Sequence, residues 1–294
     1  MAGSSDAAPV VGDAQRAVEV TAEDGSGRST TTTVRYSDTG EGRPLLLLHG
    51  VGLDARHISW KHAIPRLAAD HRVIAPDLPG HGESDKPRIR YTTDYFVDVL
   101  SAFVEELGLT RPSVAGISMG GAIALGYALS ADVARLALID SYGLGEDASW
   151  RPMASLALRI PVADQFVWNA MGVNEGTVRD ALRGYMTQAS EAFVSEVHTV
   201  LQDDDCGRTL RSWQRSEFGV YGFRTCYLDA LEAFGTPTLL IHGADDTLLP
   251  SSWSERAHER LPDSRLHVFE DCGHWPPRER PATFNRVLGE FLAT

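Results

Sequence analysis

The five residues Gly-Ile-Ser-Met-Gly at 116–120 constrain the fold of this chain more than any other stretch. They follow an apolar run at 112–115, typical of a buried strand, and precede an apolar run at 122–129, typical of a packed helix. Ser118 is therefore predicted to lie on a sharp turn between the strand and the helix, with its hydroxyl exposed. The glycines at 116 and 120 fit this turn, because any Cβ at either position would collide with the backbone as the strand folds into the helix. In this context, the pattern favours a nucleophilic serine over a serine that merely caps a helix.

Composition predicts a large soluble protein. With 294 residues, 43% of them hydrophobic, the chain can bury a large core as one domain or as a core with an inserted subdomain. It has no run of 18 apolar residues, and residues 1–13 lack a basic start and an apolar segment, so we expect a cytoplasmic location. The net charge of -13 argues against nucleic acid or an anionic membrane as partners, because both would repel the chain.

The cysteines predict neither a disulfide framework nor a zinc site. The chain has an odd number of cysteines, namely Cys206, Cys226 and Cys272, and none of them forms a CxxC pair. Free thiols are therefore expected. No other spacing implies a metal or an organic cofactor. We therefore expect a small-molecule substrate, no cofactor, and a monomer or homodimer.

Strand and helix patterns alternate along most of the chain. A predicted β-hairpin at 17–36 is followed by predicted strands at 44–48, 72–75, 112–115, 133–139, 236–241 and 265–269, and by predicted helices at 60–69, 93–107, 122–129, 252–260 and 281–292. Such alternation predicts an α/β fold with a mostly parallel, doubly wound sheet. Active groups are then expected beyond the carboxyl ends of the strands.

The alternation stops between about 142 and 232, where helical patterns continue without a buried strand. We expect residues 142–232 to form an inserted helical cap. The core would then comprise residues 16–141 and 233–294, and residues 1–15, which are rich in Gly, Ala, Ser and Asp, would form a flexible tail.

A nucleophilic serine needs a base, and the base needs an orienting carboxylate. His274 lies directly after the last predicted strand and is the candidate base. Asp246 follows strand 236–241 at the same sheet edge and is the candidate acid. Asp245 satisfies the spacing equally well, and Asp140, at the end of strand 133–139, is a third possibility.

Attack on a carbonyl also requires two donors for the developing oxyanion. The N-H of Met119, directly after the serine, is one candidate. The turn His-Gly-Val-Gly at 49–52 can offer the N-H of Val51 as the second, although an ordinary strand-ending turn would show the same residues.

Taken together, these motifs resemble the α/β-hydrolase family over nearly the whole chain from about residue 34. The segments that carry the resemblance are 49–50, 77–87, 116–121, 243–250 and 273–276. The family pattern places its acid three residues after the glycine of the second His-Gly segment, which selects Asp246. His49, His81 and His242, each next to a glycine, are expected to be structural.

The resemblance implies hydrolysis. A serine at 118 disfavours the branches that use aspartate as nucleophile, so we expect cleavage of a carboxylic ester with an apolar acyl or aryl group through an acyl-enzyme. The alternative is a carbon-carbon bond hydrolase of the meta-cleavage type, which shares Ser-Met-Gly-Gly and Gly-His-Trp but often has asparagine where this chain has Ile117. A non-catalytic ligand-binding receptor on the same fold is the alternative from another class.

The substrate pocket is expected to be formed partly by the cap. Its apolar side chains suggest an acyl or aryl site, although core packing between cap helices would explain them equally well. The candidate pocket residues are Trp150, Met153, Phe166 and Trp168.

Overall fold

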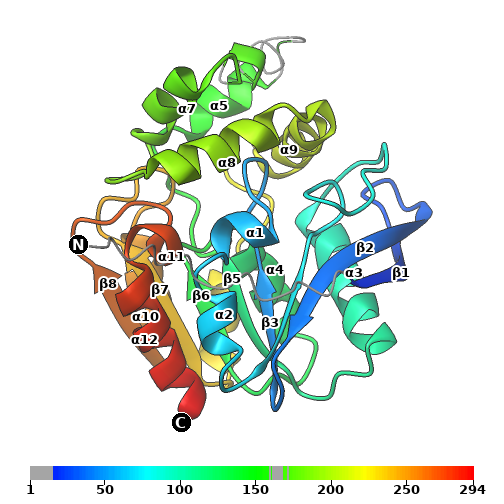
Figure 1. Cartoon of the computed structure of the whole chain (residues 1–294), viewed down its shortest axis with the longest axis vertical. Helices are drawn as coiled ribbons and strands as arrows, with labels where there is room; N and C mark the ends of the chain where they lie inside the picture. Colours follow the sequence, from blue (N-terminus) through cyan, green and yellow to red (C-terminus); the bar gives the residue numbers. More distant parts are fainter. Residues whose placement is uncertain (1–15, 159, 161–167, 171) are drawn as a thin grey trace, which may run out of the picture.

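The computed structural model describes residues 16–158, 160, 168–170 and 172–294, and these contain one eight-stranded sheet (Figure 1). The strand order is β1-β2-β4-β3-β5-β6-β7-β8. The first two strands pair antiparallel, β2 is antiparallel to β4, and the remaining neighbours are parallel, which confirms the mostly parallel α/β fold. The strands are β1 Arg16–Glu23, β2 Ser29–Thr39, β3 Pro44–Leu48, β4 Arg72–Pro76, β5 Ser113–Ile117, β6 Leu136–Ile139, β7 Thr238–Gly243 and β8 Ser264–Phe269.

The central strands are buried on both faces. In β3, Leu45 and Leu47 join the apolar cluster on one face of the sheet, whereas Leu46 and Leu48 join the cluster on the other. Successive side chains of a strand point to opposite faces, so an unbroken run of leucines is suited to a strand that helices cover on both sides.

Helices cover both faces of the sheet (Figure 1). Buried side chains of α3 (Thr93–Glu106), α4 (Met119–Ala128) and α10 (Ser252–Arg260) form the cluster on one face. Those of α1 (Arg56–Ser59), α2 (Ile64–Leu67) and α12 (Pro281–Ala293) contribute to the other. The short helix α11 (Pro276–Glu279) directly precedes α12.

The predicted helix at 60–69 was wrong. The chain instead forms α1, which ends at Ser59, and α2, which begins at Ile64, with turns between them. Pro65 explains the break, because proline has no N-H to donate and its ring clashes with the carbonyl four residues earlier inside a helix. It is tolerated in the first turn of α2, where no intrahelical partner is needed.

Helices of the segment 142–232 lie over one end of the sheet, at the top of Figure 1. They are α5 Arg151–Ala157, α7 Glu175–Leu182, α8 Glu191–Leu201 and α9 Asp204–Glu217, followed by the 3-10 helix η1 Leu228–Ala233. Side chains of α7 and α8, among them Phe193 and Val197, belong to the same apolar cluster as Trp275 beyond β8. We keep the name cap for the described residues of 142–232.

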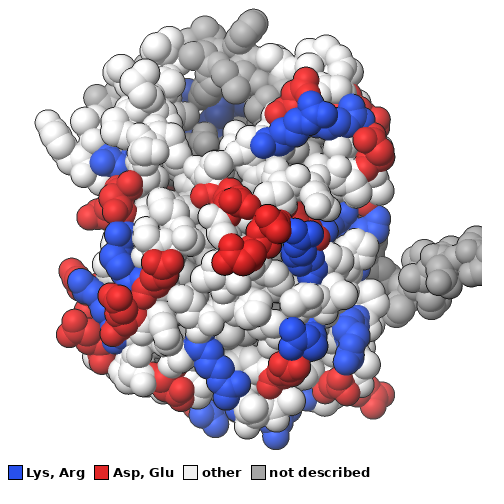
Figure 2. All heavy atoms as spheres, turned by 90° about the vertical axis from the view of Figure 1, so that its left-hand side faces the viewer, with Lys and Arg blue, Asp and Glu red and all other residues white. Residues whose placement is uncertain are grey.

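Charges of both signs are interspersed over the face shown in Figure 2, and no continuous basic surface covers it. The three cysteines are free: Cys206 and Cys272 are buried, and Cys226 is exposed. Among the described residues, no helix combines the length and the apolar character needed to cross a membrane.

Candidate active site

Ser118 lies on the predicted turn between β5 and α4, with φ 55° and ψ -121°. This conformation is rare for a residue with a side chain and costs roughly 1–3 kcal/mol, so the surroundings must hold it. A Cβ at Gly116 would lie 2.1 Å from the carbonyl oxygen of Gly120, and one at Gly120 would lie 2.4 Å from that of Leu48. The two glycines therefore let the turn close on itself and pack against the end of β3.

Backbone hydrogen bonds hold the strained serine. Its N-H donates to the carbonyl of Ile139 at 2.9 Å, and its own carbonyl accepts from the N-H of Tyr142 at 3.1 Å. The side chain remains partly exposed and lines a cavity. The end of β6 and the residues after it thus hold the backbone of the turn.

The two predicted oxyanion donors lie in the turn after β3 and directly after the serine. On either side of Val51, the N-H of Gly50 donates to Asp54 Oδ2 at 2.7 Å and the N-H of Gly52 donates to His81 Nε2 at 3.1 Å. The N-H groups of Val51 and of Met119, at the start of α4, have no acceptor among the described residues. Both are therefore available to a ligand oxygen.

Asp246 contacts the candidate base directly. Its Oδ2 lies 2.7 Å from His274 Nδ1, and its Oδ1 accepts the N-H groups of Leu248 at 2.8 Å and Leu249 at 3.1 Å. Burial alone would raise the pKa of Asp246, but His274 and His242 together hold it below its ordinary value. The carboxylate therefore stays charged and orients the ring, leaving His274 Nε2 for the cavity.

The other two candidate acids lie elsewhere. Asp245 is exposed. Asp140 is fully buried at the end of β6, where its Oδ1 accepts the N-H of Gly243 at 2.8 Å and lies 3.7 Å from His242 Nε2. Of the three carboxylates considered from the sequence, Asp246 is the one hydrogen-bonded to His274.

Ser118 and His274 line the same cavity, but their side chains do not form a hydrogen bond in this structure. Such contacts are often long in ligand-free enzymes and tighten when substrate binds. The predicted serine, imidazole and carboxylate thus lie close together. The hydrogen bond between His274 and Asp246 is formed, whereas the one between Ser118 and His274 is not.

The loop that carries His274 is clamped to the cap, a feature that the sequence analysis missed. The N-H of His274 donates to the carbonyl of Tyr185 at 2.8 Å. Glu279 Oε1 accepts the N-H of Gly273 at 3.0 Å, while its Oε2 accepts the N-H of Thr187 at 2.8 Å. The only signal was an acidic residue five positions after the histidine.

The cavity has a volume of about 380 Å³ and a mostly aromatic and aliphatic lining. Trp150 and Trp168 line it, as expected. Met153 does not: its side chain is 71% exposed because it lies on the outer side of α5, so the expectation for it was wrong. Phe166 lies outside the described residues. Other side chains that line the cavity are Leu53, Tyr142, Ala154, Ala157, Leu158, Tyr185, Leu210, Arg211, Trp213, Gln214, Phe218, Leu248, Leu249 and Trp275.

His49 and His81 have structural contacts, as expected. His49 Nδ1 donates to the carbonyl of Gly50 at 2.7 Å, and its Nε2 accepts the N-H of Leu78 at 2.9 Å. Burial lowers the pKa of His81 well below its ordinary value, and its neutral ring bridges Pro79 and Gly52. Both rings shape the turn that presents Val51.

Comparison with known proteins agrees with this geometry. A model of the alpha/beta hydrolase family matches residues 45–287. The chain belongs to that family. It is 32% identical over 266 residues to the 2-hydroxymuconate semialdehyde hydrolase of Pseudomonas sp. (strain CF600), an alignment that covers 87% of this chain and 89% of that relative.

Two solved structures of α/β hydrolases illustrate the range of chemistry among similar folds. The meta-cleavage product hydrolase of Pseudomonas fluorescens IP01 superposes with a TM-score of 0.76 at 26% identity, covering 94% of this chain and 97% of that one. The thermophilic esterase of Thermogutta terrifontis gives a TM-score of 0.72, also at 26% identity, covering 95% and 98%. A hydrolase is thus established for this chain, whereas the bond that it cleaves is not.

Proposed function

We propose that this α/β hydrolase cleaves a carbon-carbon bond next to the ketone of a 2-hydroxy-6-oxo-dienoate, using Ser118 as nucleophile, His274 as base and Asp246 as the orienting acid. The observation that carries the proposal is the 32% identity to a 2-hydroxymuconate semialdehyde hydrolase over nearly the full length of both chains, the cap included. The sequence analysis favoured ester hydrolysis and gave carbon-carbon cleavage as the alternative, so the preference between the two reactions is now reversed.

The reaction follows from the groups around the cavity. Ser118 Oγ attacks the ketone carbon while His274 Nε2 takes the hydroxyl proton, and the oxyanion is held by the N-H groups of Val51 and Met119. The bond to an alkene carbon cannot break into the π system, so the 2-hydroxydienoate must first tautomerise to its 2-keto form, in which the proton of the 2-hydroxyl moves to C5. The C5–C6 bond then breaks, its electron pair passes into the dienolate conjugated with the C2 ketone, and the dienolate receives the proton from His274. Water activated by His274 releases the acyl group as a carboxylic acid and restores Ser118.

The cavity suits a substrate with an apolar body and one anionic end. Tryptophan and leucine are the most frequent side chains in its lining, and Arg211 on α9 is the one lysine or arginine among the described lining residues. A guanidinium beside an apolar cavity is suited to pairing with a carboxylate. We therefore assign the carboxylate of the dienoate to Arg211.

One specific observation favours ester hydrolysis as the second candidate. Ile117 occupies the position before the serine where carbon-carbon hydrolases often have asparagine, and an esterase shares the fold with a TM-score of 0.72. The same serine, base and donors would cleave an ester, with an alkoxide in place of the dienolate as leaving group.

A paired assay tests the proposal. We expect the yellow colour of a 2-hydroxy-6-oxo-dienoate to disappear with a kcat/KM at least 100-fold above that for a short nitrophenyl ester. The reverse ratio would overturn the carbon-carbon reading in favour of the esterase.

The assignment of Arg211 is tested separately. Arg211→Gln should raise KM for the dienoate at least 10-fold, because a charge-assisted pair is lost, and leave KM for the neutral ester within about 2-fold. Arg183→Gln is the matched control, since Arg183 is an exposed cap arginine paired with Asp180. Equal effects of Arg211→Gln on both substrates would remove the carboxylate role.

A further inference from the structure

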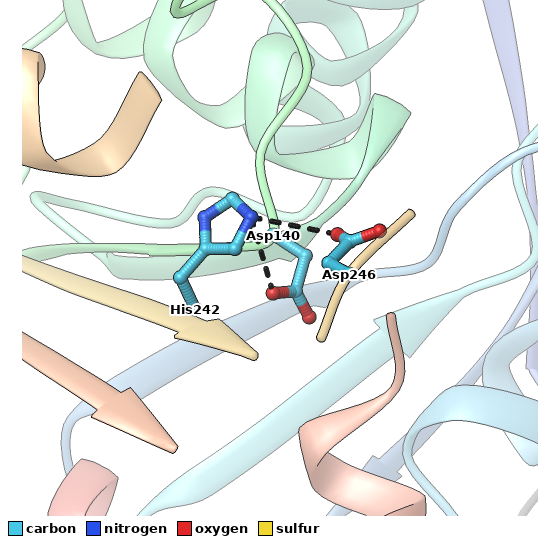
Figure 3. A group of neighbouring side chains, drawn as sticks. All are labelled: Asp140, His242 and Asp246. Atoms are coloured by element: carbon cyan, nitrogen blue, oxygen red, sulfur yellow. Dashed lines mark ion pairs between the residues drawn. The ribbon is translucent and has the colours of Figure 1, made fainter. Parts of the chain in front are cut away.

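Behind the carboxylate of Asp246 lies a second imidazole, which the proposed mechanism does not use (Figure 3). His242, in β7, is fully buried, and its Nε2 lies 3.4 Å from Asp246 Oδ2. That oxygen is the same one that contacts His274 Nδ1. One carboxylate oxygen therefore lies between two imidazoles, one facing the cavity and one facing the interior.

His242 also contacts a second carboxylate. Figure 3 shows Asp140 and Asp246 on the same side of the ring, with both ion pairs made by the same nitrogen, and Asp140 Oδ1 lies 3.7 Å from Nε2. Both carboxylates and the ring are excluded from solvent. Two buried negative charges this close need a positive charge between them.

The hydrogen bonds of His242 accommodate that positive charge. Its Nε2 lies 2.9 Å from the carbonyl of Leu249, an acceptor, so Nε2 carries a proton. Its Nδ1 lies 2.7 Å from the hydroxyl of Ser254, which can accept a proton from the ring. A doubly protonated ring thus has an acceptor for each N-H. The protonated Nε2 also offers no lone pair, which argues against a metal ion held by these three side chains.

Asp140 is the alternative site for the proton, and it lacks a hydrogen-bond acceptor for it in the described part of the chain. A protonated Asp140 would place its O-H on Oδ2, because Oδ1 accepts the N-H of Gly243. Oδ2 is buried without a hydrogen-bond partner among the described residues, so this O-H would have no acceptor.

We propose that His242 is a buried imidazolium that balances Asp140, and that this ion pair sets the pH at which Ser118 becomes reactive. His242 is a positioning residue in this role, since it acts on His274 through Asp246. The proposal rests on the proposed function only for its effect on reactivity.

The electrostatics of the neighbouring groups give the direction of the effect. Burial alone would lower the pKa of His242, but Asp140 and Asp246 raise it above its ordinary value. Burial raises the pKa of Asp140 well above its ordinary value, and His242 is the strongest of the groups that oppose this rise. The other titratable groups facing the cluster are His274, Cys272, whose pKa burial raises so that it stays neutral, and Glu279, whose carboxylate accepts backbone N-H groups.

Removing the imidazolium should leave Asp140 as an uncompensated negative charge beside the Asp246–His274 pair. His242→Gln keeps an N-H donor near the position of Nε2 but cannot carry charge. The added negative charge disfavours loss of a proton from the Ser118–His274 pair, so the rising limb of the pH–reactivity profile should move up by roughly one pH unit. In the double variant Asp140→Asn, His242→Gln, the net charge of the pair is again zero, and the limb should return to its original pH.

The readout is the rate at which a fluorophosphonate labels Ser118 between pH 5 and 9, which needs no knowledge of the substrate. An unshifted limb in His242→Gln, or a limb that stays shifted in the double variant, would overturn the proposal. If His242 had only a structural role, the limb would stay shifted in the double variant, because adding Asp140→Asn would not repair a damaged site. His258→Gln, an exposed histidine of α10, is the control for histidine loss.

A second measurement is independent of reactivity. Nitrogen-15 NMR of histidine-labelled protein should show both ring nitrogens of His242 protonated at pH 7, with the signal assigned by its loss in His242→Gln. A ring with one unprotonated nitrogen would overturn the ion pair. If the wild type is not labelled by the fluorophosphonate at any pH, the proposed function fails, whereas the NMR result still decides the charge of His242.

Discussion

The backbone N-H of His274 donates to the carbonyl of Tyr185, joining the candidate base to the cap across 2.8 Å. A Cβ at the preceding residue, Gly273, would lie 2.3 Å from the same carbonyl oxygen, so the two segments pack without a side chain between them. The position of the base therefore depends on a segment nearly 90 residues earlier in the chain. Changes in the cap contact should reach the chemistry.

The first prediction concerns that contact. Glu279→Gln replaces a buried carboxylate that accepts N-H groups from both the histidine loop and the cap. Loss of the charge-assisted bonds should lower the free energy of unfolding by about 2 kcal/mol and reduce kcat more than it changes KM. Urea unfolding and steady-state kinetics measure the two effects, with Glu290→Gln on the exposed side of α12 as control. Unchanged stability would show that the clamp is weak.

Ser118→Ala should lower turnover by about 10⁶-fold, because removing the nucleophile leaves only the oxyanion donors and binding. The same change should not lower the free energy of unfolding, because the side chain of Ser118 caps no helix and the strained backbone is the same in both proteins. Single-turnover assays and thermal unfolding provide the measurements. Substantial remaining activity would exclude Ser118 as nucleophile.

Asp246→Asn should reduce kcat by about 10⁴-fold, because an amide favours the wrong tautomer of the imidazole that it orients. Asp245→Asn is the neighbouring control: its side chain is exposed and should leave kcat within about 2-fold. Comparing the two variants with either proposed substrate checks the assignment. A large loss in Asp245→Asn would reverse it.

Stability should also depend on the charge of Asp246. Because the folded protein lowers the pKa of this group, its stabilisation is present above the unfolded value of about 3.9 and is lost as pH falls through the folded pKa. The free energy of unfolding should therefore fall more steeply below pH 4 in the wild type than in Asp246→Asn. Urea titrations between pH 2.5 and 6 test this, and parallel curves would contradict it.

The cysteines should differ sharply in reactivity. Burial raises the pKa of the Cys206 thiol to about 12 and also raises the pKa values of Cys272 and Cys226, but Cys226 is the exposed one of the three. A disulfide reagent such as DTNB should modify one thiol of the native protein, and Cys226→Ser should abolish that reaction. Rapid modification of three thiols without denaturant would show that the buried ones open readily.

Much of the local structure was predictable from the sequence. The turn at Ser118, the buried leucine strand and helix α10 depend on glycine sterics, apolar runs and helical periodicity, which act between near neighbours. The break at Pro65 belongs to the same class of signal, although the predicted helix ran through it.

What the residue pattern alone determined was the family of the chain and the small set of side chains able to do chemistry. The family resemblance had already selected Asp246. Only the tertiary structure showed the contacts of each side chain, because hydrogen bonding and charge depend on groups that are distant along the chain: it placed Asp246 on His274, enclosed Asp140 against His242, and turned Met153 outward. The sequence pattern does not show that Glu279 and Tyr185 hold the histidine loop against the cap, since each contact joins the cap to a segment distant from it along the chain.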